Sequence, residues 1–497
     1  MNWSTWLPLL VVASALIPGL IIFTLAEEKV FLRTSLNLAG ALSKLLLTGW
    51  MLWGVYHGHQ YETNVPFLPG LELVLRADPL SLLFISLSGV LWLLTTIYAI
   101  GYLEGSPNRS RFFGFFSLCV TSTAGIALSH NLITFLFFYE LLTLVTYPLV
   151  VHRGTEVARR AGQIYLIYTF FGGALLLLGT AWLYSITGTV EFRPQGMLHH
   201  LGEENYPALI AIFILLIAGL GVKAALVPLH GWLPEAMVAP APVSALLHAV
   251  AVVKAGAFGI VRVVHDVYGV NFAAEIGVTG PLAVMAAITI IYGSIRALFQ
   301  DDLKRRLAFS TVSQVSYITL GVVIVGPIAT IGGIVHLVHQ GLMKITLFFC
   351  AGNLAETLGI RKVHEMDGVG RRMPWTMVAF TIGAFGMIGA PPVAGFVSKW
   401  YLGLGALEAG QYWVILVLVG SSIFNAIYFL PVLHRVWFRD PPPNWPEERD
   451  FGHKETAWGL LLPPVMTALL ALVAGLMASA WFSPLEWVRL IAHREFY

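Results

Sequence analysis

The sequence has few charged residues for its length. Asp, Glu, Lys and Arg make up 11% of the 497 residues, whereas hydrophobic residues make up 57%. So little charge cannot cover the surface of a water-soluble protein of this size, and the composition indicates a polytopic membrane protein. The formal net charge of +2 provides no basic face, and no glycine-rich phosphate loop follows a strand-like segment. The composition therefore argues against nucleic-acid binding.

Cysteine is nearly absent. The two cysteines, Cys119 and Cys350, lie far apart within apolar runs, which argues against a disulfide framework, a CxxC redox pair and a cysteine-based metal site. We interpret both as small apolar packing residues. Motifs for flavin, nicotinamide and iron–sulfur groups are missing as well, so we expect neither a cofactor nor a bound metal in this chain.

Long apolar runs, by contrast, recur along the whole sequence. They are long enough to cross about 30 Å of hydrocarbon, and together they leave no room for a folded soluble domain. The pattern predicts an all-α membrane protein with fourteen transmembrane helices. Their expected ranges are 6–25, 33–55, 79–102, 111–129, 131–151, 160–186, 208–236, 241–266, 277–299, 306–326, 328–357, 375–404, 412–438 and 456–481. The first run lacks the basic start of a signal peptide, so we expect it to remain as a span.

Basic residues are distributed unevenly between the expected loops. With the N-terminus placed outside, nineteen lysines and arginines fall in inner loops and five in outer loops. Positive charge accumulates on the cytoplasmic side of membrane proteins. The asymmetry therefore supports fourteen spans with both termini on the outer side. We expect the membrane to be the inner (cytoplasmic) membrane of a bacterial or archaeal cell.

The remaining lysines all fall inside expected spans: Lys44, Lys223, Lys254, Lys344 and Lys399. A lysine at bilayer depth costs about 2.5–3.5 kcal/mol on insertion scales, so chance is a poor explanation for five of them. Burial lowers the pKa of an ammonium group and a nearby carboxylate raises it again, so such a lysine can carry a proton whose affinity its neighbour controls. The clearest carboxylate at this depth is Glu140, which interrupts an apolar and aromatic helix.

Histidines extend this series of titratable groups. His336, His339 and Lys344 share one expected helix. At about 100° per residue, His336 and Lys344 lie roughly 80° apart and His339 falls on the neighbouring face, so the three form a broad polar stripe. Imidazoles titrate near neutrality and can relay protons through water. His248 joins Lys254 in the eighth span.

Prolines interrupt two of the spans that carry lysines. Pro228 follows the lysine of the seventh span, and Pro391 and Pro392 precede the lysine of the twelfth. A proline frees the carbonyl four residues before it, and a membrane tolerates a free carbonyl only beside protein or water. We therefore expect both helices to be broken, with the carbonyls of Met387 and Ile388 released in the twelfth.

The two interrupted spans suggest an inverted repeat. Helices 4 to 8 and helices 9 to 13 form two five-helix units in this interpretation, and an odd helix number makes the second unit enter the membrane from the opposite side. The expected divisions are 1–105 for the first three helices, 106–270 and 271–440 for the two repeats, and 441–497 for the last loop and helix.

Structural explanations remain open for each buried polar group. Glu140, Lys223 and Lys399 can belong to fixed ion pairs that hold helices together, and the histidines can simply form hydrogen bonds between helices. Lys44 lies outside both expected repeats and has no visible acidic partner. We expect it to contact another subunit or to extend towards the membrane surface.

Four stretches of sequence carry a family resemblance. They are GVKAALVPLHGWLPEAMVAPAPVSALLHAVAVVKAG, DDLKRRLAFSTVSQVSYITLG, HLVHQGLMKITLFFCAGNL and GFVSKW. These stretches closely resemble the antiporter-like membrane subunits shared by respiratory complex I, membrane-bound hydrogenases and Mrp-type Na⁺/H⁺ antiporters. The resemblance covers approximately residues 75 to 440. It implies a fourteen-helix fold, two inverted five-helix repeats, broken helices 7 and 12, and a charged axis along the membrane midplane.

The resemblance also implies roles for single residues. Glu140 looks like the family's fifth-helix glutamate, and Lys223 like the seventh-helix lysine that pairs with it. Lys254 is similar to the family's eighth-helix bridging lysine. The eleventh-helix relay of the family is similar to His336, His339 and Lys344. Lys399 is similar to the exit-side residue of the twelfth helix.

Among the subunit types, the chain looks most like the D-type member of a Mrp antiporter or of a hydrogenase-like complex. M-type complex I subunits usually have a glutamate where this chain has Lys399. The fourteenth span is not followed by the long lateral helix of the L type. The stretch PLHGWLPEAMVAPAPVSALLHA nevertheless resembles the L type.

We therefore expect a proton-translocating subunit of a multi-subunit membrane complex, with or without Na⁺/H⁺ antiport. Protons would load Lys223 and pass along the buried lysines and histidines to Lys399, while Glu140 sets the loading affinity. The driving reaction, for example that of an NADH:quinone oxidoreductase-like complex, would occur in partner subunits, so the chain alone is not expected to be an enzyme. A self-contained transporter of a small solute and a non-conducting scaffold are the alternatives.

Overall fold

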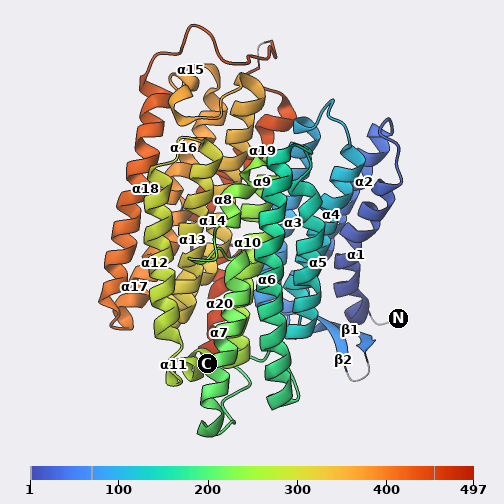
Figure 1. Ribbon diagram of the computed structural model, residues 1–497, viewed down its shortest axis with the longest axis vertical. Helices are drawn as coiled ribbons and strands as arrows, with labels where there is room; N and C mark the ends of the chain where they lie inside the picture. Colours follow the sequence, from blue (N-terminus) through green and yellow to red (C-terminus); the bar gives the residue numbers. More distant parts are fainter. Residues whose placement is uncertain (1–2, 69–70, 453, 497) are drawn as a thin grey trace.

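The structure is a computed structural model that describes residues 3–68, 71–452 and 454–496. Long helices run side by side along the longest axis of the molecule, and both chain ends lie towards its lower side in Figure 1. The first half contains α1(Trp3–Phe23), α2(Val30–Tyr56), α3(Pro79–Tyr102), α4(Arg109–Leu128), α5(Leu132–Val150), α6(Glu156–Thr187), α7(Tyr206–Lys223), α8(Trp232–Glu235), α9(Ala241–Ala249) and α10(Val252–Arg262). The second half contains the π-helical turn η3(Val263–Tyr268), then α11(Val270–Glu275), α12(Thr279–Leu298), α13(Leu303–Val323), α14(Pro327–Leu358), α15(Val369–Arg372), α16(Pro374–Ile388), α17(Ala394–Glu408), α18(Tyr412–Phe438), α19(Trp458–Leu476) and α20(Pro484–Phe496).

Polar residues just before the helices fix several helix starts. The side chains of Asp78, Asn131 and Asp302 accept hydrogen bonds from backbone amides of the first turns of α3, α5 and α13. These amides have no partner within the helix, and a cap of this kind contributes about 1 kcal/mol. At the other end, Gly359 ends α14 with a φ of 69°, a conformation that favours glycine.

Among the described residues, twelve helical segments are long and apolar enough to cross a membrane, and one of them, Ala241–Tyr268, runs through α9, α10 and η3. The predicted fourteen spans are therefore not confirmed as a number. Two expected spans fall outside the twelve. The first, α13, carries three basic residues in its first turn and many hydroxyl groups along its length, and the second is divided into the short helices α16 and α17.

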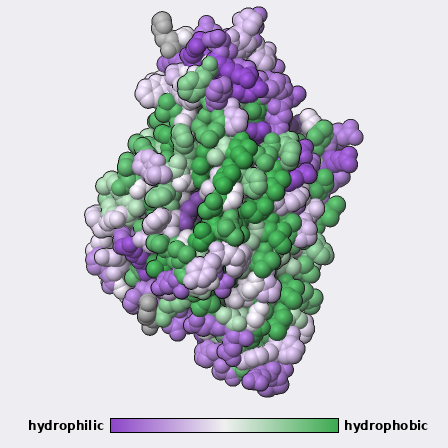
Figure 2. All heavy atoms as spheres, turned by 90° about the vertical axis from the view of Figure 1, so that its left-hand side faces the viewer, coloured by the Kyte–Doolittle hydropathy of each residue, from purple (hydrophilic) through white to green (hydrophobic). Residues whose placement is uncertain are grey.

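Two helical regions form the centre of the bundle. The most apolar stretches of Ala241–Tyr268 and Pro327–Leu358 are completely buried inside the chain. Apolar side chains cover much of the middle of the face that carries α17, α18 and α12, and polar side chains gather at its upper and lower ends (Figure 2). This arrangement fits a protein whose outer surface faces hydrocarbon and whose centre holds the polar residues.

A two-stranded hairpin and a short last helix add to the predicted all-α architecture. The strands β1(Tyr61–Leu68) and β2(Leu71–Ala77) pair antiparallel between α2 and α3. Burial is confined to the paired strand ends at Tyr61, Thr63, Leu75 and Ala77, and each strand is short, so the helix-length hydropathy pattern did not reveal them. The last helix, α20, is amphipathic and packs against α14 and α3.

Three helices of the bundle are interrupted rather than two. The predicted breaks are confirmed: α7 ends at Lys223, and α16 and α17 are separated by residues 389–393. The expected eighth span, 241–266, is also divided, because α9 ends at Ala249 and α10 begins at Val252. The sequence contains no proline at this third break.

Candidate functional site

Lys223 is the last residue of α7, and its ammonium group is buried against α5. It donates a hydrogen bond to the carbonyl oxygen of Tyr139 and lies 3.4 Å from the centroid of the same tyrosine ring. The next residue of α5, Glu140, is within electrostatic range of Lys223, but the two do not come within the 4.0 Å of an ion pair. The carboxylate packs against Gly173 of α6, where a Cβ atom would collide with Oε1 of Glu140. Glu140 and Lys223 therefore interact electrostatically without direct contact.

The break in α7 begins before its proline. The helix stops at Lys223, whereas the sequence predicts a helix up to residue 236, and Ala225 takes a left-handed conformation with a φ of 57°. Such a φ costs a non-glycine residue about 1–3 kcal/mol. Close packing accompanies the break, because Gly256 of α10 lies directly against the backbone of Ala224 and a Cβ there would collide with it.

Lys254 and His248 lie on either side of the break between α9 and α10, and both are fully buried. The ammonium group of Lys254 donates a 2.7 Å hydrogen bond to the carbonyl oxygen of Leu337 in α14. The ring of His248 lies 4.4 Å from the ring of Phe348, also in α14. His248 is within electrostatic range of Lys344. The eighth span therefore connects directly with the helix that carries the predicted polar stripe.

The predicted stripe on α14 is buried along its whole length. The Nδ1 atom of His336 and the hydroxyl of Ser398 in α17 are 2.8 Å apart, and His336 is within electrostatic range of both Lys254 and Lys399. His339 is fully buried one turn further along α14. Lys344 donates a 2.6 Å hydrogen bond to the hydroxyl of Ser310 in α13.

Lys399 in α17 closes the break of the twelfth span. Its ammonium group donates hydrogen bonds to the carbonyl oxygens of Met387 at 3.0 Å and Ile388 at 2.9 Å, and to the hydroxyl of Ser422 at 3.0 Å. These are the two carbonyls that the prolines are expected to release. Gly389 makes room for the lysine, because a Cβ at this position would lie 2.6 Å from Cδ of Lys399.

A chain of hydrogen bonds joins Lys344 to Lys399 through residues that the sequence did not single out. The hydroxyl of Tyr428 in α18 donates to Ser310, which also accepts from Lys344, and the Tyr428 and Ser310 oxygens are 2.8 Å apart. Tyr428 also lies 2.5 Å from Oδ1 of Asn425. The amide Nδ2 of Asn425 donates to the carbonyl oxygen of Met387 at 2.9 Å, which is also an acceptor for Lys399. The one sequence feature that could have indicated such a chain is the number of hydroxyl residues in the expected span 306–326.

Together, Glu140, Lys223, Lys254, His248, His336, His339, Lys344 and Lys399 form what we call the lysine row. Its members come from α5, α7, α9, α10, α14 and α17. The four lysines of the row donate to carbonyl or hydroxyl oxygens, and none of them forms an ion pair with a carboxylate among the described residues.

Lys44 stands apart from the row, and our expectation for it is wrong. The side chain is fully buried inside this chain instead of reaching another subunit or the membrane surface. Its ammonium group donates a 3.0 Å hydrogen bond to Ser88 of α3 and lies 5.7 Å from the centroid of the Trp92 ring. Because α2 and α3 pack closely, the Ser88 hydroxyl accepts this hydrogen bond. The expectation for Lys44 considered only acidic partners.

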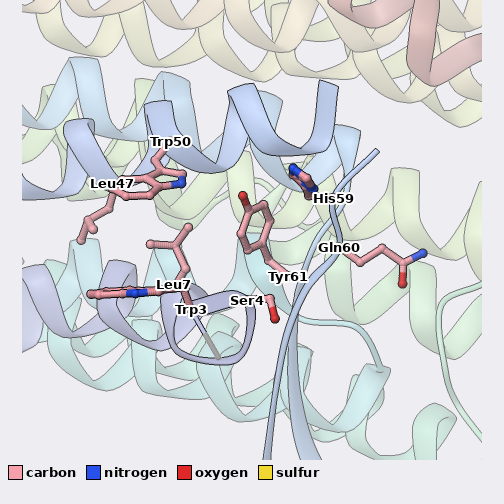
Figure 3. A pocket seen from close by; sticks show the side chains of 8 residues that line it. All are labelled: Trp3, Ser4, Leu7, Leu47, Trp50, His59, Gln60 and Tyr61. Carbon is pink, nitrogen blue, oxygen red and sulfur yellow. The ribbon is translucent and has the colours of Figure 1, made fainter. Parts of the chain in front are cut away.

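Among the described residues, three of the cavities lie outside the lysine row and are lined by none of its residues. The first, of about 290 Å³, lies between α1, α2 and the start of β1, where the rings of Trp3 and Trp50 are 6.4 Å apart and Tyr61 forms one wall (Figure 3). The second, of about 670 Å³, is an apolar groove between α2, α3, α14, α19 and α20. The third, of about 360 Å³, lies near Tyr102 and Lys304.

Family models match two parts of the chain. The model described as NADH:quinone oxidoreductase/Mrp antiporter, TM, matches residues 129–425, which contain every member of the lysine row. The model described as NADH-Ubiquinone oxidoreductase (complex I), chain 5 N-terminus, matches residues 70–113.

Curated relatives cover most of the chain. The N subunit of NADH-quinone oxidoreductase of Desulforudis audaxviator is 36% identical over 432 residues, which are 85% of this chain and 84% of that protein. The D subunit of the Na(+)/H(+) antiporter of Bacillus subtilis is 27% identical over 489 residues, which are 97% of this chain and 96% of that protein.

Solved structures share the fold. A chain of the Mrp complex from a Dietzia species superposes with a TM-score of 0.84 at 24% identity, covering 100% of this chain and 98% of that chain. A chain of the membrane-bound sulfane sulfur reductase, an archaeal respiratory membrane complex, superposes with a TM-score of 0.86 at 24% identity, covering 99% and 98%. The sequence match over residues 129–425 and the relative at 36% identity show that the chain belongs to the family of NADH:quinone oxidoreductase and Mrp antiporter membrane subunits.

Proposed function

We propose that this protein is a proton-translocating membrane subunit of a multi-subunit complex, and that the lysine row carries the protons. The proposal rests on the hydrogen-bond partners of the four lysines of the row. Each lysine of the row donates to a neutral oxygen, so loss of its proton breaks no direct ion pair with a carboxylate. Lys223 has the carboxylate of Glu140 within electrostatic range but not in contact.

A buried arginine in the same chain provides the comparison. Arg262 is also fully buried, but it forms ion pairs of 2.8 Å with Asp78 and with Asp266. Arginine keeps its charge in proteins, so its burial requires carboxylates. A lysine can lose its proton when it is buried. The contrast favours proton carriers over fixed ion pairs in the row.

The histidines supply positions that can accept a proton between the lysines. Among the described residues, neither ring nitrogen of His248 or of His339 has a hydrogen-bond partner. Buried polar atoms without a protein partner are normally bonded to ordered water, and imidazole next to water can pass a proton in either direction. In the proposed route, protons load Lys223 and pass by Lys254 and the histidines.

The far part of the route uses the hydrogen-bond chain between Lys344 and Lys399. Glu140 and Lys399, the two ends of the row, are only half-buried within this chain. We infer that neighbouring membrane subunits cover both ends, as the subunit names of the relatives suggest. The driving reaction then takes place in those partners, because this chain has no readable redox motif.

Three finer features of the proposal follow the sequence interpretation. A D-type role with Na⁺/H⁺ antiport is supported by the relative from Bacillus subtilis, and a role in quinone reduction by the relative from Desulforudis audaxviator. The positive-inside rule supports placing both termini outside. The repeats 106–270 and 271–440 are supported by the breaks that follow Lys223 and precede Lys399.

Transport by the purified complex tests the proposal. The complex is reconstituted in liposomes, and proton movement is followed with a pH-sensitive dye for wild type, Lys344→Met and Lys44→Met. Both substitutions remove a fully buried ammonium that donates to a serine hydroxyl, so they are matched in burial and in the bond lost. We expect Lys344→Met to abolish coupled transport and Lys44→Met to retain it.

The alternatives predict other results. A scaffold predicts that Lys344→Met transports normally whenever the complex assembles, which native gel electrophoresis of the same samples shows. A small-solute transporter predicts solute uptake without partner subunits. Undiminished proton transport by an assembled Lys344→Met complex would refute the proposed function.

A further inference from the structure

A second group of buried charges lies outside the lysine row, where α10 continues into η3. Arg262 at the end of α10 forms ion pairs of 2.8 Å with Asp78, the residue before α3, and with Asp266 in η3. Arg494 of α20 lies 3.7 Å from Asp78, and its neighbour Glu495 is buried at the same place. We call these five residues the Arg262 cluster.

The Arg262 cluster contains one carboxylate more than it has guanidinium groups. Three carboxylates, those of Asp78, Asp266 and Glu495, face the two arginines Arg262 and Arg494. One uncompensated negative charge in a buried site is costly, and a carboxyl group avoids the cost by binding a proton.

Asp78 is not the group that binds this proton. Although burial opposes it, the guanidinium groups of Arg262 and Arg494 lower the pKa of Asp78 to about 2. Asp78 also accepts hydrogen bonds from the backbone amide and the hydroxyl of Ser81 at 2.8 and 3.0 Å. These contacts favour the ionised form, so the surplus carboxylate is one of the other two.

The contacts of Asp266 and Glu495 leave room for a shared proton. Only Oδ2 of Asp266 bonds to Arg262, and Oδ1 is buried without a hydrogen-bond partner among the described residues. Glu495 accepts a 3.2 Å hydrogen bond from the backbone amide of Gln195 through Oε2. Burial, with a further contribution from the charge of Asp266, raises the pKa of Glu495 to about 8.

We propose that Asp266 and Glu495 share one exchangeable proton, which makes the Arg262 cluster an acid site separate from the lysine row. The site lies on the same helical segment as Lys254, since η3 continues α10. Arg262 follows Lys254 by eight residues, or about 12 Å along a helix. A proton bound here changes the charge at one end of the helix whose other end holds Lys254.

His130 lies within electrostatic range of Arg262 and Asp78, but burial and the charges of Arg76 and Arg262 lower its pKa to about 4, so it does not compensate the surplus carboxylate. Two further groups near the cluster have separate partners. The Nε2 atom of His265 and the carbonyl oxygen of Val322 are 3.2 Å apart, and the His265 ring packs against Phe496. Arg193 pairs with Glu191 at 3.2 Å, and both side chains are about half exposed. Within the described residues, no group of three or more His, Cys, Asp or Glu is arranged to hold a metal ion. The surplus charge therefore indicates a proton and not a metal as the ligand.

Infrared titration of the purified complex tests this site, and it does not require transport. The carbonyl band of a protonated carboxyl group is followed between about pH 5 and pH 10, where ordinary carboxyl groups are ionised. We expect the band of wild type to contain a component that disappears with rising pH and is missing in Glu495→Gln. Glu486→Gln is the matched control, because Glu486 lies on the same helix in an exposed pair with Arg489. The titrating carboxyl band should be the same in Glu486→Gln as in wild type.

A second variant keeps the test decisive if Glu495→Gln fails to assemble. Arg494→Gln removes a partly exposed positive charge from the cluster, so the midpoint of the band should move up by roughly one pH unit. Absence of a titrating carboxyl band in wild type would overturn the proposal, as would an identical titrating band in wild type and Glu495→Gln. A midpoint that falls when Na⁺ replaces choline would also overturn it, because the cluster would then bind a sodium ion. None of these results depends on whether the lysine row transports protons.

Discussion

The hydroxyl of Tyr428 lies 2.8 Å from the hydroxyl of Ser310, and this contact connects two lysines on different helices. A tyrosine hydroxyl has a single proton, so Tyr428 donates either to Ser310 or to Asn425. When Lys344 is charged it donates to Ser310, and Tyr428 is free to donate to Asn425. When Lys344 is neutral it can accept from Ser310, which then accepts from Tyr428. Within the proposed function, the direction of these bonds transmits the charge of Lys344 towards Lys399.

Tyr428→Phe removes this connection and leaves the ring in place. Within the proposed function, we expect the rate of coupled proton transport to fall about tenfold, which corresponds to about 1.4 kcal/mol, the scale of one hydrogen bond. This rate is measured with the pH-sensitive dye in the reconstituted complex. Tyr268→Phe is the control, because it removes a buried hydroxyl bonded to the carbonyl of Leu209 outside the row. Equal rates in both variants would show that the chain through Tyr428 is not used.

Gly173→Ala should change the position of Glu140. A Cβ atom at residue 173 would collide with the carboxylate, so Glu140 must move relative to Lys223. Because the carboxylate sets the proton affinity of its lysine neighbour, the pH dependence of transport should shift. Gly179→Ala on the same helix is the control, since its Cβ would meet only leucine side chains, the nearest being Cδ2 of Leu216 at 2.9 Å. A pH profile that is unchanged in Gly173→Ala would contradict the proposed role of Glu140.

Arg262→Gln should destabilise the protein strongly. The substitution leaves Asp78 and Asp266 buried without their shared guanidinium, and breaking a buried pair in this way costs about 3–5 kcal/mol. Thermal denaturation of the purified complex measures the effect. Arg305→Gln breaks the exposed pair with Glu235 and should cost about 1 kcal/mol or less. A similar small effect of both substitutions would show that the Arg262 cluster does not stabilise the fold.

The docking of α20 should weaken as the pH rises. Burial, strengthened by the charge of Asp266, raises the pKa of Glu495 from an ordinary value of 4.5 to about 8. A carboxyl group with a raised pKa supports the folded state fully below its unfolded pKa, and this support is lost as the pH rises through the folded pKa. Amide hydrogen exchange of α20 should therefore accelerate more steeply in wild type than in Glu495→Gln across this range. Parallel pH courses in the two proteins would disprove the assignment.

The sequence was informative wherever a property depended on neighbouring residues. Apolar runs placed most helices within a few residues of their bounds, and the prolines located the break beside Lys399, including the carbonyls of Met387 and Ile388. The break after Lys223 was expected, but its position was not. That helix ends at Lys223, two residues before the left-handed Ala225, and Gly256 of another helix packs against the backbone of Ala224 at this break.

Partners of buried side chains could not be predicted in the same way. Lys44 was expected at a surface because no acidic partner was visible, yet Ser88 of α3 supplies its acceptor. Tyr428 lies 118 residues from Ser310 in the chain, and no local pattern relates the two. The break at Val250 likewise occurs without a proline and has no signal in the sequence.

The sequence by itself determined that this is a membrane protein with ammonium groups at bilayer depth, because hydropathy and the cost of burying charge are properties of single segments. Tertiary structure alone decided which oxygens those ammonium groups contact, and which charges are neutralised by carboxylates, as Arg262 is, or left with neutral partners, as Lys344 is. The reason is physical: a hydrogen bond requires two groups within about 3 Å. That proximity is fixed by how helices distant in sequence pack together.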